Sequence, residues 1–312
     1  MDLPLAAVPE PDRSLEPAGF LVTDDDGDRL HFLDWDTPAG APDRPGVLLI
    51  HGLAQTAWSW APVARRLGGP TGPHRVVAMD LRGHGLSDAP TEDDAYALDA
   101  LAAGVAAVAE GSGLLAGADD RIVLGGHGFG AIVAAVAVVA LGARCAGLVL
   151  VDGGWESLET ATGLDVEEFL RGLDEPPEVM RSMTAFLEDR AAFDPTTWDD
   201  DQQRAARATV VETHAGRVVP ATRPHAVDAC VRAMFGYDPL ATLSAITAPI
   251  VALLAADDEG RSRARALDMA SAARLAAGRT AIRSVVFPHA GHNLMRYRPR
   301  DVGAAILLAT RP

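Results

Sequence analysis

The chain has 312 residues, 48% of them hydrophobic, with a mean hydropathy of +0.10, which allows a sizeable core in one large α/β domain with an insertion or in two domains. Its formal net charge of −16 argues against a nucleic-acid-binding surface, which is normally basic, and an acidic surface mainly serves solubility. No stretch of the sequence reaches the roughly 18 uncharged apolar residues of a membrane helix, so we expect no membrane partner.

Residues 1–17 are acidic and proline-bearing, which predicts a flexible tail and not a signal peptide. Cys145 and Cys230 lie in apolar helical contexts without metal-ligand spacing, so we interpret them as buried thiols of a reducing compartment. Two small arginine groups, at 261–265 and 296–300, are interpreted as solvated faces. We therefore expect a cytoplasmic protein without a metal or another cofactor.

The first half of the chain alternates short apolar strands with helices. Residues 20–23 and 30–34 are predicted to pair as strands around an aspartate-rich turn, which lacks the glutamate of a calcium loop. Further strands are then predicted at 47–50, 75–79, 121–124 and 147–151. The helices between them are predicted at 60–67, 98–110 and 130–141. This alternation is typical of a parallel sheet with both faces covered.

The pattern changes between residues 154 and 235. No strand-like run of comparable quality occurs there, and we predict a helical segment. The alternation then resumes with strands at 250–254 and 284–287 and helices at 263–276 and 301–309. The simplest account is a sheet domain, formed by residues 18–153 and 236–312, that is interrupted by a helical cap at 154–235.

The most informative motif is an incomplete one. Residues 121–134 read RIVLGGHGFGAIVA, an apolar strand followed by a glycine turn and a helix, which is the pattern of a G-x-S-x-G nucleophile elbow. Gly128 stands where the serine would be. A glycine has no hydroxyl group, so it cannot attack a carbonyl carbon or carry an acyl group.

Five segments in this order resemble the α/β-hydrolase superfamily over nearly the whole chain after the tail. They are VLLIHGLAQTAWSW, VVAMDLRGHGLSD, LGGHGFGA, LLAADDEG and FPHAGHNLMRYRP. The resemblance implies an α/β fold with a mostly parallel, eight-stranded sheet flanked by helices and an inserted helical cap. It also implies a site at the carboxyl ends of the strands.

The resemblance implies an oxyanion hole made of two backbone N–H groups, those of Leu53 and Phe129. Backbone donors do not depend on a serine side chain, so we expect this hole to be intact. His51 is interpreted as a structural residue that braces its loop. His84 and Ser87, in the DLRGHGLSD segment, are interpreted as architectural, although Ser87 would replace the nucleophile if its loop reached the site.

A histidine and a carboxylate complete the implied site. His292 follows the last predicted strand, where the family's general base stands. Asp258 is the favoured carboxylate, with Asp257 as the adjacent alternative, and it would hold the tautomer of the imidazole. Asp152 occupies a position that some relatives use for the acid, but we interpret it as a brace at the cap entrance.

His127, beside the elbow tip, and Trp155, at the start of the cap, are the candidate substrate-binding residues. The cap also carries apolar side chains that either line a pocket or form its own core. They are Trp155, Phe169, Met180, Met183, Phe186, Phe193 and Trp198.

Three functional hypotheses follow. In the first, His292 and Asp258 act as a general-base dyad on a small, largely apolar carbonyl substrate, as in lyases and cofactor-free oxygenases that resemble this fold. In the second, the chain is a serine hydrolase of esters, lactones or C–C bonds disabled at Gly128, by drift toward a relaxed turn or by engineering. In the third, it is a non-catalytic binder of a small apolar ligand.

Overall fold

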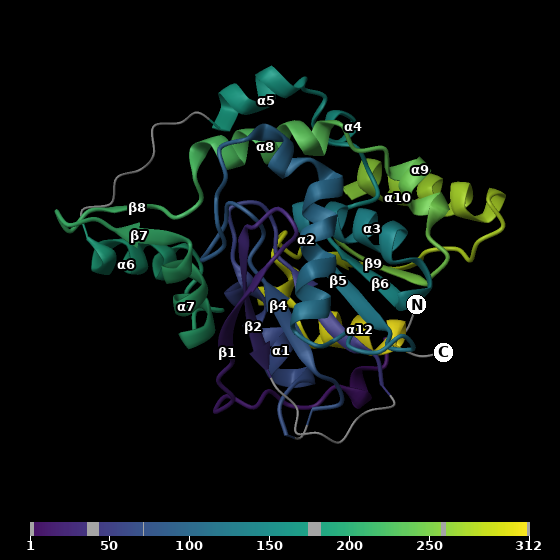
Figure 1. The fold of residues 1–312 in the computed structure, drawn as a ribbon, viewed down its shortest axis with the longest axis horizontal. Helices are drawn as coiled ribbons and strands as arrows, with labels where there is room; N and C mark the ends of the chain where they lie inside the picture. Colours follow the sequence, from purple (N-terminus) through teal and green to yellow (C-terminus); the bar gives the residue numbers. More distant parts are fainter. Residues whose placement is uncertain (1–2, 36–43, 71, 174–181, 257–259, 311–312) are drawn as a thin grey trace.

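The computed structural model describes residues 3–35, 44–70, 72–173, 182–256 and 260–310. Within these residues, eight strands form one sheet in the order β1-β2-β4-β3-β5-β6-β9-β10 (Figure 1). The pairs β1–β2 and β2–β4 are antiparallel, and the other pairs are parallel. The strands are β1 (Ala18–Thr23), β2 (Arg29–Trp35), β3 (Gly46–Ile50), β4 (Val76–Met79), β5 (Ile122–His127), β6 (Cys145–Val151), β9 (Ile250–Ala256) and β10 (Arg283–Pro288).

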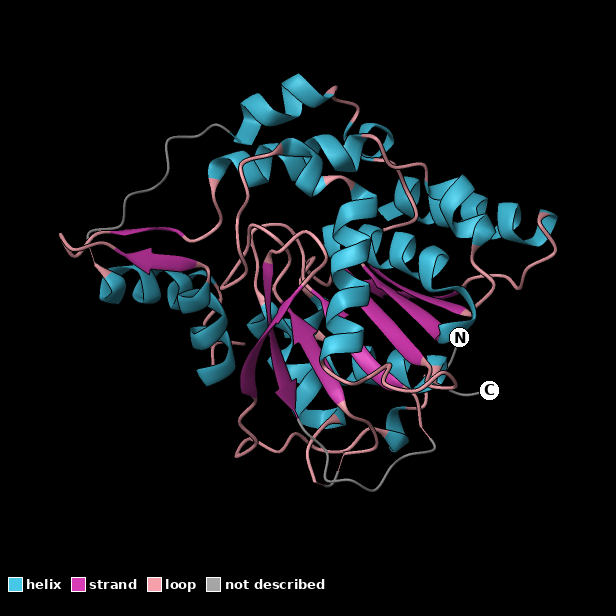
Figure 2. Ribbon diagram, viewed as in Figure 1, coloured by secondary structure: helices cyan, strands magenta, loops and turns pink. Residues whose placement is uncertain are grey.

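Helices cover both faces of this sheet (Figure 2). The core helices are α1 (Ala61–Leu67), α2 (Leu98–Gly111), α3 (Phe129–Leu141), α9 (Pro239–Ala245), α10 (Gly260–Ala276), α11 (Leu294–Tyr297) and α12 (Pro299–Ala309). Short 3-10 turns occur at η1 (Leu5–Ala7), η2 (Ala57–Trp60), η3 (Asp93–Tyr96) and η4 (Gly142–Arg144). The predicted α/β architecture with its mostly parallel eight-stranded sheet is confirmed.

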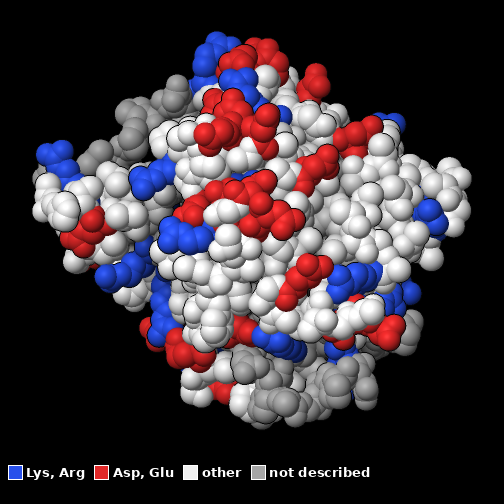
Figure 3. All heavy atoms as spheres, in the orientation of Figure 1, with Lys and Arg blue, Asp and Glu red and all other residues white. Residues whose placement is uncertain are grey.

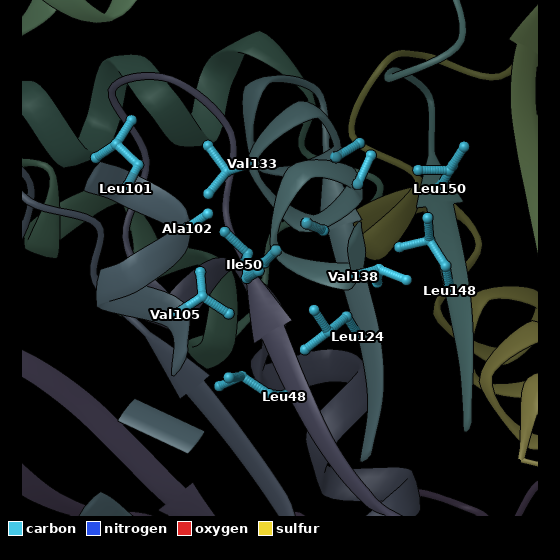
Figure 4. Packing of buried hydrophobic residues seen from close by; sticks show 14 of the residues in the cluster. Leu48, Ile50, Leu101, Ala102, Val105, Leu124, Val133, Val138, Leu148 and Leu150 are labelled. Atoms are coloured by element: carbon cyan, nitrogen blue, oxygen red, sulfur yellow. The ribbon is translucent and has the colours of Figure 1, made fainter. Parts of the chain in front are cut away.

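The central strand β3 shows why both faces must be covered. Alternate residues of a strand point to opposite faces. Leu48 and Ile50 belong to the hydrophobic cluster that α2 and α3 cover, where Figure 4 shows them beside Val105. Leu49 belongs to the second cluster, on the face that α1 and α12 cover. A strand buried on both sides has no polar alternation, as the run GVLLI shows.

The segment between β6 and β9 is only partly helical. Its helices are α4 (Leu158–Thr162), α5 (Val166–Leu173), α6 (Met183–Phe193), α7 (Asp200–Ala208) and α8 (Pro224–Phe235). A two-stranded antiparallel sheet of β7 (Val210–Glu212) and β8 (Val218–Pro220) lies between α7 and α8. The prediction of a helical segment without a strand-like run of comparable quality therefore missed this short hairpin. Strands of three residues are too short to show a period of two in the sequence. We call α4 through α8 the cap.

Buried polar side chains hold the loops at the carboxyl edge of the sheet. The Nδ1–H group of His51 donates to the Gly52 carbonyl at 2.7 Å, and its Nε2 atom accepts from the Leu81 N–H at 3.0 Å. Asp80 accepts from the Ala57 N–H at 2.7 Å. The Ser87 hydroxyl donates to the Asp80 carbonyl at 2.7 Å. The predicted bracing role of His51 is confirmed, and Ser87 is engaged in its own loop.

The surface carries many acidic side chains, as the net charge of the chain requires, and both thiols are buried. Acidic side chains gather in patches at the top and centre of the face in Figure 3. Cys145 and Cys230 are free and buried. Among the described residues, no helix is long and apolar enough to span a bilayer. The described residues also hold no cluster of three or more potential metal-ligating side chains of the His, Cys, Asp and Glu types.

A substitution at Gly130 directly tests the close packing between α3 and β3. A Cβ atom at this position would lie 2.3 Å from the His51 carbonyl oxygen and 2.4 Å from that of Ile50. We therefore expect Gly130→Ala to lower the free energy of unfolding by about 3 kcal/mol, measured by urea denaturation, because backbone atoms must move. The control is Gly172→Ala on the exposed part of α5, where a Cβ atom meets nothing within 4 Å. This change should be neutral or stabilising by roughly 0.5–1 kcal/mol. Equal effects of the two substitutions would contradict the packing argument.

Candidate active site

Gly128 lies at the tip of the turn between β5 and α3, where the sequence analysis placed a nucleophile elbow. Gly128 has a φ of +52°, in the left-handed region that favours glycine. A Cβ atom at Gly126 would lie 2.2 Å from the Gly130 carbonyl oxygen, and one at Gly153 would lie 2.8 Å from the Gly128 Cα atom. The turn is thus packed tightly from two sides.

His292 faces this turn from the loop after β10. A Cβ atom at Gly128 would lie 3.2 Å from His292 Nε2 and 3.5 Å from Cε1. The His292 side chain is 58% exposed, so solvent and small molecules reach it. The structure therefore brings together the two residues that the sequence analysis placed at the centre of the site. Nε2 is the ring atom directed at the elbow tip.

The carboxylate beside His292 belongs to Asp152. Its Oδ2 atom lies 2.5 Å from His292 Nδ1, and the Asp152 side chain is 1% exposed. Asp152 follows β6 directly and has a φ of +49°, which is uncommon for a residue other than glycine. The interpretation of Asp152 as only a brace is therefore wrong. Asp258 and Asp257, the carboxylates favoured from the sequence, lie outside the described residues.

Arg263 of α10 binds the other oxygen of this carboxylate. Its Nη1–H group donates to Asp152 Oδ1 at 2.8 Å, and its Nε–H group donates to Glu156 at 2.6 Å. The Ala255 N–H group also donates to Asp152 Oδ1, at 2.9 Å. Arg263 is thus part of the site, and the expectation that its arginine group lies on a solvated face is wrong for this residue.

These contacts determine the charge of Asp152. Burial alone raises the pKa of a carboxyl group, because it penalises the charged form. Here the hydrogen bond with His292 and the positive charge of Arg263 outweigh burial, and the pKa of Asp152 is lowered below its usual value. Asp152 is therefore ionised at neutral pH. An ionised carboxylate at Nδ1 keeps the proton on that nitrogen and leaves Nε2 as the basic atom.

The two N–H groups predicted for the oxyanion hole start from neighbouring parallel strands. Leu53 follows β3 and Phe129 follows β5, and the ends of these strands pair at Ile50 and Gly126. Phe129 is the first residue of α3, so its N–H group has no acceptor within the helix. The Gly52 Cα atom would lie 4.0 Å from a Cβ atom at Gly128. Both loops therefore adjoin the elbow tip.

The two candidate substrate-binding residues are packed inside the protein. His127 is 1% exposed, with Nδ1 at 3.1 Å from Gln55 Oε1 and Nε2 at 3.1 Å from the His292 carbonyl oxygen. Burial, and secondarily the nearby His292, lower the pKa of His127 to about 3, so it is neutral. Trp155 is 1% exposed, and the Arg263 guanidinium lies 5.4 Å from its ring centre. His127 therefore supports the His292 loop through its contact with the His292 carbonyl oxygen.

A cavity of about 370 Å³ lies between these loops and the cap. Ala54 and Asn293, the neighbours of Leu53 and His292 in the chain, are on its wall, as are Phe186 and Arg190 of α6. A second cavity of about 240 Å³ shares Ala54, Phe186 and Arg190. Two of the apolar cap residues singled out from the sequence, Phe186 and Phe193, thus line the first cavity.

The remaining members of that apolar set have other surroundings or are not described. The Phe169 ring packs against Phe235 with their centres 5.8 Å apart. Met180 lies outside the described residues. Neither His127 nor Trp155 is on the wall of the two cavities. Gln55 lines the first cavity and Arg190 lines both. Gln55 belongs to the segment VLLIHGLAQTAWSW but is not singled out within it, and no motif marks Arg190 in the sequence.

The comparisons with known proteins agree with this fold. A family model described as "Alpha/beta hydrolase family" matches residues 47–305. Epoxide hydrolase 4 of Mus musculus is 34% identical over 123 residues, which are 39% of this chain and 31% of the mouse protein. The chain thus spans less than a third of the length of this curated relative.

Solved structures match over nearly the whole chain at low identity. The crystal structure of E-2-(acetamidomethylene)succinate hydrolase gives a TM-score of 0.74 at 19% identity, covering 94% of this chain and 98% of the other. A thioesterase domain from the curacin biosynthetic pathway gives a TM-score of 0.68 at 20% identity, covering 93% and 99%. At this identity the likeness shows the fold.

The buried histidines predict a loss of stability in mild acid. Burial lowers the pKa of His84 and of His127 to about 3, whereas the unfolded chain binds these protons below about pH 6.5. The folded state is therefore favoured fully above pH 6.5. We expect each histidine to remove roughly 1.4 kcal/mol from the free energy of unfolding per pH unit between about 6.5 and 3.

Urea denaturation between about pH 7.5 and pH 4.5 measures this slope. The matched variant is His84→Phe, because His84 Nε2 has no hydrogen-bond partner among the described residues. In this variant the slope of the free energy of unfolding against pH should be smaller by the contribution of one proton, and the remaining slope should be unchanged. An unchanged slope in the variant would show that His84 does not titrate as its burial requires.

Proposed function

The chain belongs to the alpha/beta hydrolase family, and on that premise we propose that it is an enzyme that hydrolyses a small carbonyl substrate without a covalent intermediate. The observation that carries this proposal is the orientation of His292. Its Nδ1 atom is held by Asp152, and its Nε2 atom is directed at the elbow tip, where Gly128 leaves room beside it. A general base needs its acceptor atom within hydrogen-bond reach of the proton that it removes.

In the proposed reaction, a water molecule takes the place that a serine hydroxyl would have. His292 Nε2 accepts a proton from the water as the water oxygen bonds to the carbonyl carbon, and the carbonyl electron pair moves to oxygen. The Leu53 and Phe129 N–H groups stabilise that oxyanion by a few kcal/mol. The tetrahedral intermediate then expels the leaving group, which takes the proton back from His292. The products together contain one added water.

The roles of Asp152 and Arg263 follow from their charges. Ionised Asp152 stabilises the imidazolium that forms at His292 during attack. Arg263 keeps that carboxylate ionised and fixes its direction through Oδ1. The names of the curated relatives, epoxide hydrolases and an esterase, also describe hydrolytic enzymes. A hydrolytic reaction is thus the class that the site and the relatives support together.

Removing the imidazole tests the proposed base. We expect His292→Ala to lower kcat/KM for a p-nitrophenyl ester that the wild-type protein hydrolyses by about 10²–10⁴-fold, because the substitution removes the proposed general base. The control is His214→Ala, at an exposed position between β7 and β8, which should keep the wild-type rate. Turnover that is the same in wild type and His292→Ala would rule out the mechanism.

Comparing two carboxylates decides which one serves His292. Asp152→Asn keeps the shape of the side chain but removes the charge that orients the ring, so we expect a loss approaching that of His292→Ala. Asp258→Asn should cost less, because Asp152 already occupies the Nδ1 side of the ring. The measurement is kcat/KM for the same ester. A larger loss at Asp258 would favour the assignment made from the sequence.

The geometry also supports a second candidate, a serine hydrolase disabled at position 128. A Cβ atom there would touch only the ring of His292 within 3.5 Å. A serine at this position would therefore place its hydroxyl beside Nε2, as a nucleophile requires. On this account the present chain has lost a covalent mechanism, and its surviving dyad is a remnant.

Filling position 128 separates the two candidates. We expect Gly128→Ser to form an acyl-enzyme with an aryl ester, seen as a product burst and an added acyl mass, because its hydroxyl gains a ready base. We expect Gly128→Ala to lower wild-type turnover at least about tenfold, because its methyl group occupies the site of the attacking water. Both variants share the backbone strain at φ +52°, so thermal unfolding shows whether each is folded. Wild-type turnover in Gly128→Ala would contradict the water mechanism, and no acyl mass in folded Gly128→Ser would contradict the disabled-hydrolase account.

A further inference from the structure

We propose, resting on the proposed function, that the substrate carries a carboxylate and that Arg190 of the cap binds it. The first observation is the charge of the two adjoining cavities. Their walls include Arg190 and Arg296 but neither aspartate nor glutamate. The chain as a whole has 43 acidic and 27 basic residues, so this wall has the opposite balance to the rest of the protein. A concave surface with one sign of charge concentrates ligands of the other sign.

Arg190 is an exposed residue of α6 that lines both cavities and has no carboxylate partner among the described residues. Its guanidinium lies 5.2 Å from the ring centre of Phe186, which is 5% exposed and lines both cavities. Among the described residues, the Arg190 side chain forms neither a hydrogen bond nor an ion pair. Stacking on a ring orients the plane of a guanidinium and leaves its N–H donors available. These donors match the two oxygens of a carboxylate.

Arg296 differs from Arg190 in being tied into the wall. Its Nε–H group donates to Thr197 Oγ1 at 2.7 Å and an Nη2–H group donates to the Asp194 carbonyl oxygen at 2.9 Å. The Asp194 carboxylate lies 3.9 Å from Arg296 Nη2 and offsets part of its charge. Arg296 therefore shapes the cavity and adds to its positive potential. Arg190 is the residue whose donors remain for a ligand.

The first cavity lies beside the loops that carry the proposed chemistry, and its wall includes the chain neighbours of Leu53 and His292 but not these two residues themselves. Ala54 directly follows Leu53, and Asn293 directly follows His292. Gln55 donates to Asn293 Oδ1 at 2.7 Å, which joins these two loops into one wall. A ligand whose carbonyl lies at the oxyanion hole therefore extends along this wall toward the cap.

The lining of the second cavity indicates the chemistry of the middle part of such a ligand. It shares Arg190 with the first cavity and is otherwise lined largely by apolar side chains of the β7–β8 hairpin, among them Val210, Val218 and Pro220. The inferred substrate class is a short acyl compound with an apolar spacer and a terminal carboxylate. The expectation of a largely apolar substrate is thereby extended by one anionic group.

The experiment measures binding, which needs no turnover. The probes are 4-phenylbutyrate and 4-phenylbutanamide, which share a shape and differ in charge, titrated by calorimetry at low salt. We expect the acid to bind at least about tenfold more tightly than the amide, since charge-assisted hydrogen bonds are the stronger ones. Arg190→Met keeps an apolar contact with Phe186 and should abolish this preference. Arg190→Lys should retain part of it, because the charge remains.

The matched control is Arg207→Met. Arg207 is exposed on α7 of the same cap, is absent from both cavity walls, and its loss changes the net charge by the same amount. This variant should keep the preference for the acid. The proposal is overturned if acid and amide bind equally, if the acid does not bind at millimolar concentration, or if Arg190→Met and Arg207→Met weaken the acid equally.

Failure of this inference can be told apart from failure of the proposed function. Binding of the acid should persist in His292→Ala, because that substitution leaves Arg190 unchanged. If neutral esters are turned over through His292 without any preference for anions, the proposed function stands and the inference fails. If the acid binds through Arg190 but no ester is hydrolysed, the inference stands as a ligand site and the proposed function fails.

Discussion

The hydrogen bond between Asp152 and His292 is the contact on which the site depends. The His292 imidazole lies on a loop, is 58% exposed and packs against the His127 ring, so its hydrogen-bond partner at Nδ1 contributes to the orientation of the ring. Asp152 supplies that partner from the rigid end of β6, and its own direction is set by Arg263 and by the Ala255 N–H group. The end of β6, β9 and α10, which carry Asp152, Ala255 and Arg263, therefore determine together where His292 Nε2 lies.

The glycines around the elbow preserve the geometry that this contact serves. Gly126, Gly130 and Gly153 each exclude a Cβ atom because backbone atoms lie too close. The turn at Gly128 is consequently shaped by packing and not by the residue at its tip. The described geometry places the imidazole of His292 and the loop after β3 around a glycine at the tip of this turn. This is why a reaction through water and a disabled serine mechanism are the two candidates that the geometry supports.

The sheet, its helices and the position of His292 beside the turn at Gly128 could be predicted from the sequence because apolar strands and glycine turns leave local patterns. The choice between Asp152 and Asp258 could not, because β6 and β9 are parallel neighbours whose carboxyl ends meet at the same edge. Either strand end can bring a carboxylate toward His292, and side-chain direction decides. The position of Arg190 at the cavity could not be predicted from the sequence either. An arginine on a helix matches no motif, and its place becomes clear only when the structure shows Phe186 and the opposing loops beside it.

The state of the wild-type protein during turnover tests the central claim most directly. Rapid acid quenching of steady-state ester hydrolysis, followed by intact-protein mass spectrometry, shows whether an acyl group is attached to the chain. The account predicts hydrolysis that requires His292 and a protein of unmodified mass at every time point. An acyl adduct that forms and decays at the rate of turnover would contradict it, because another side chain would then be the nucleophile.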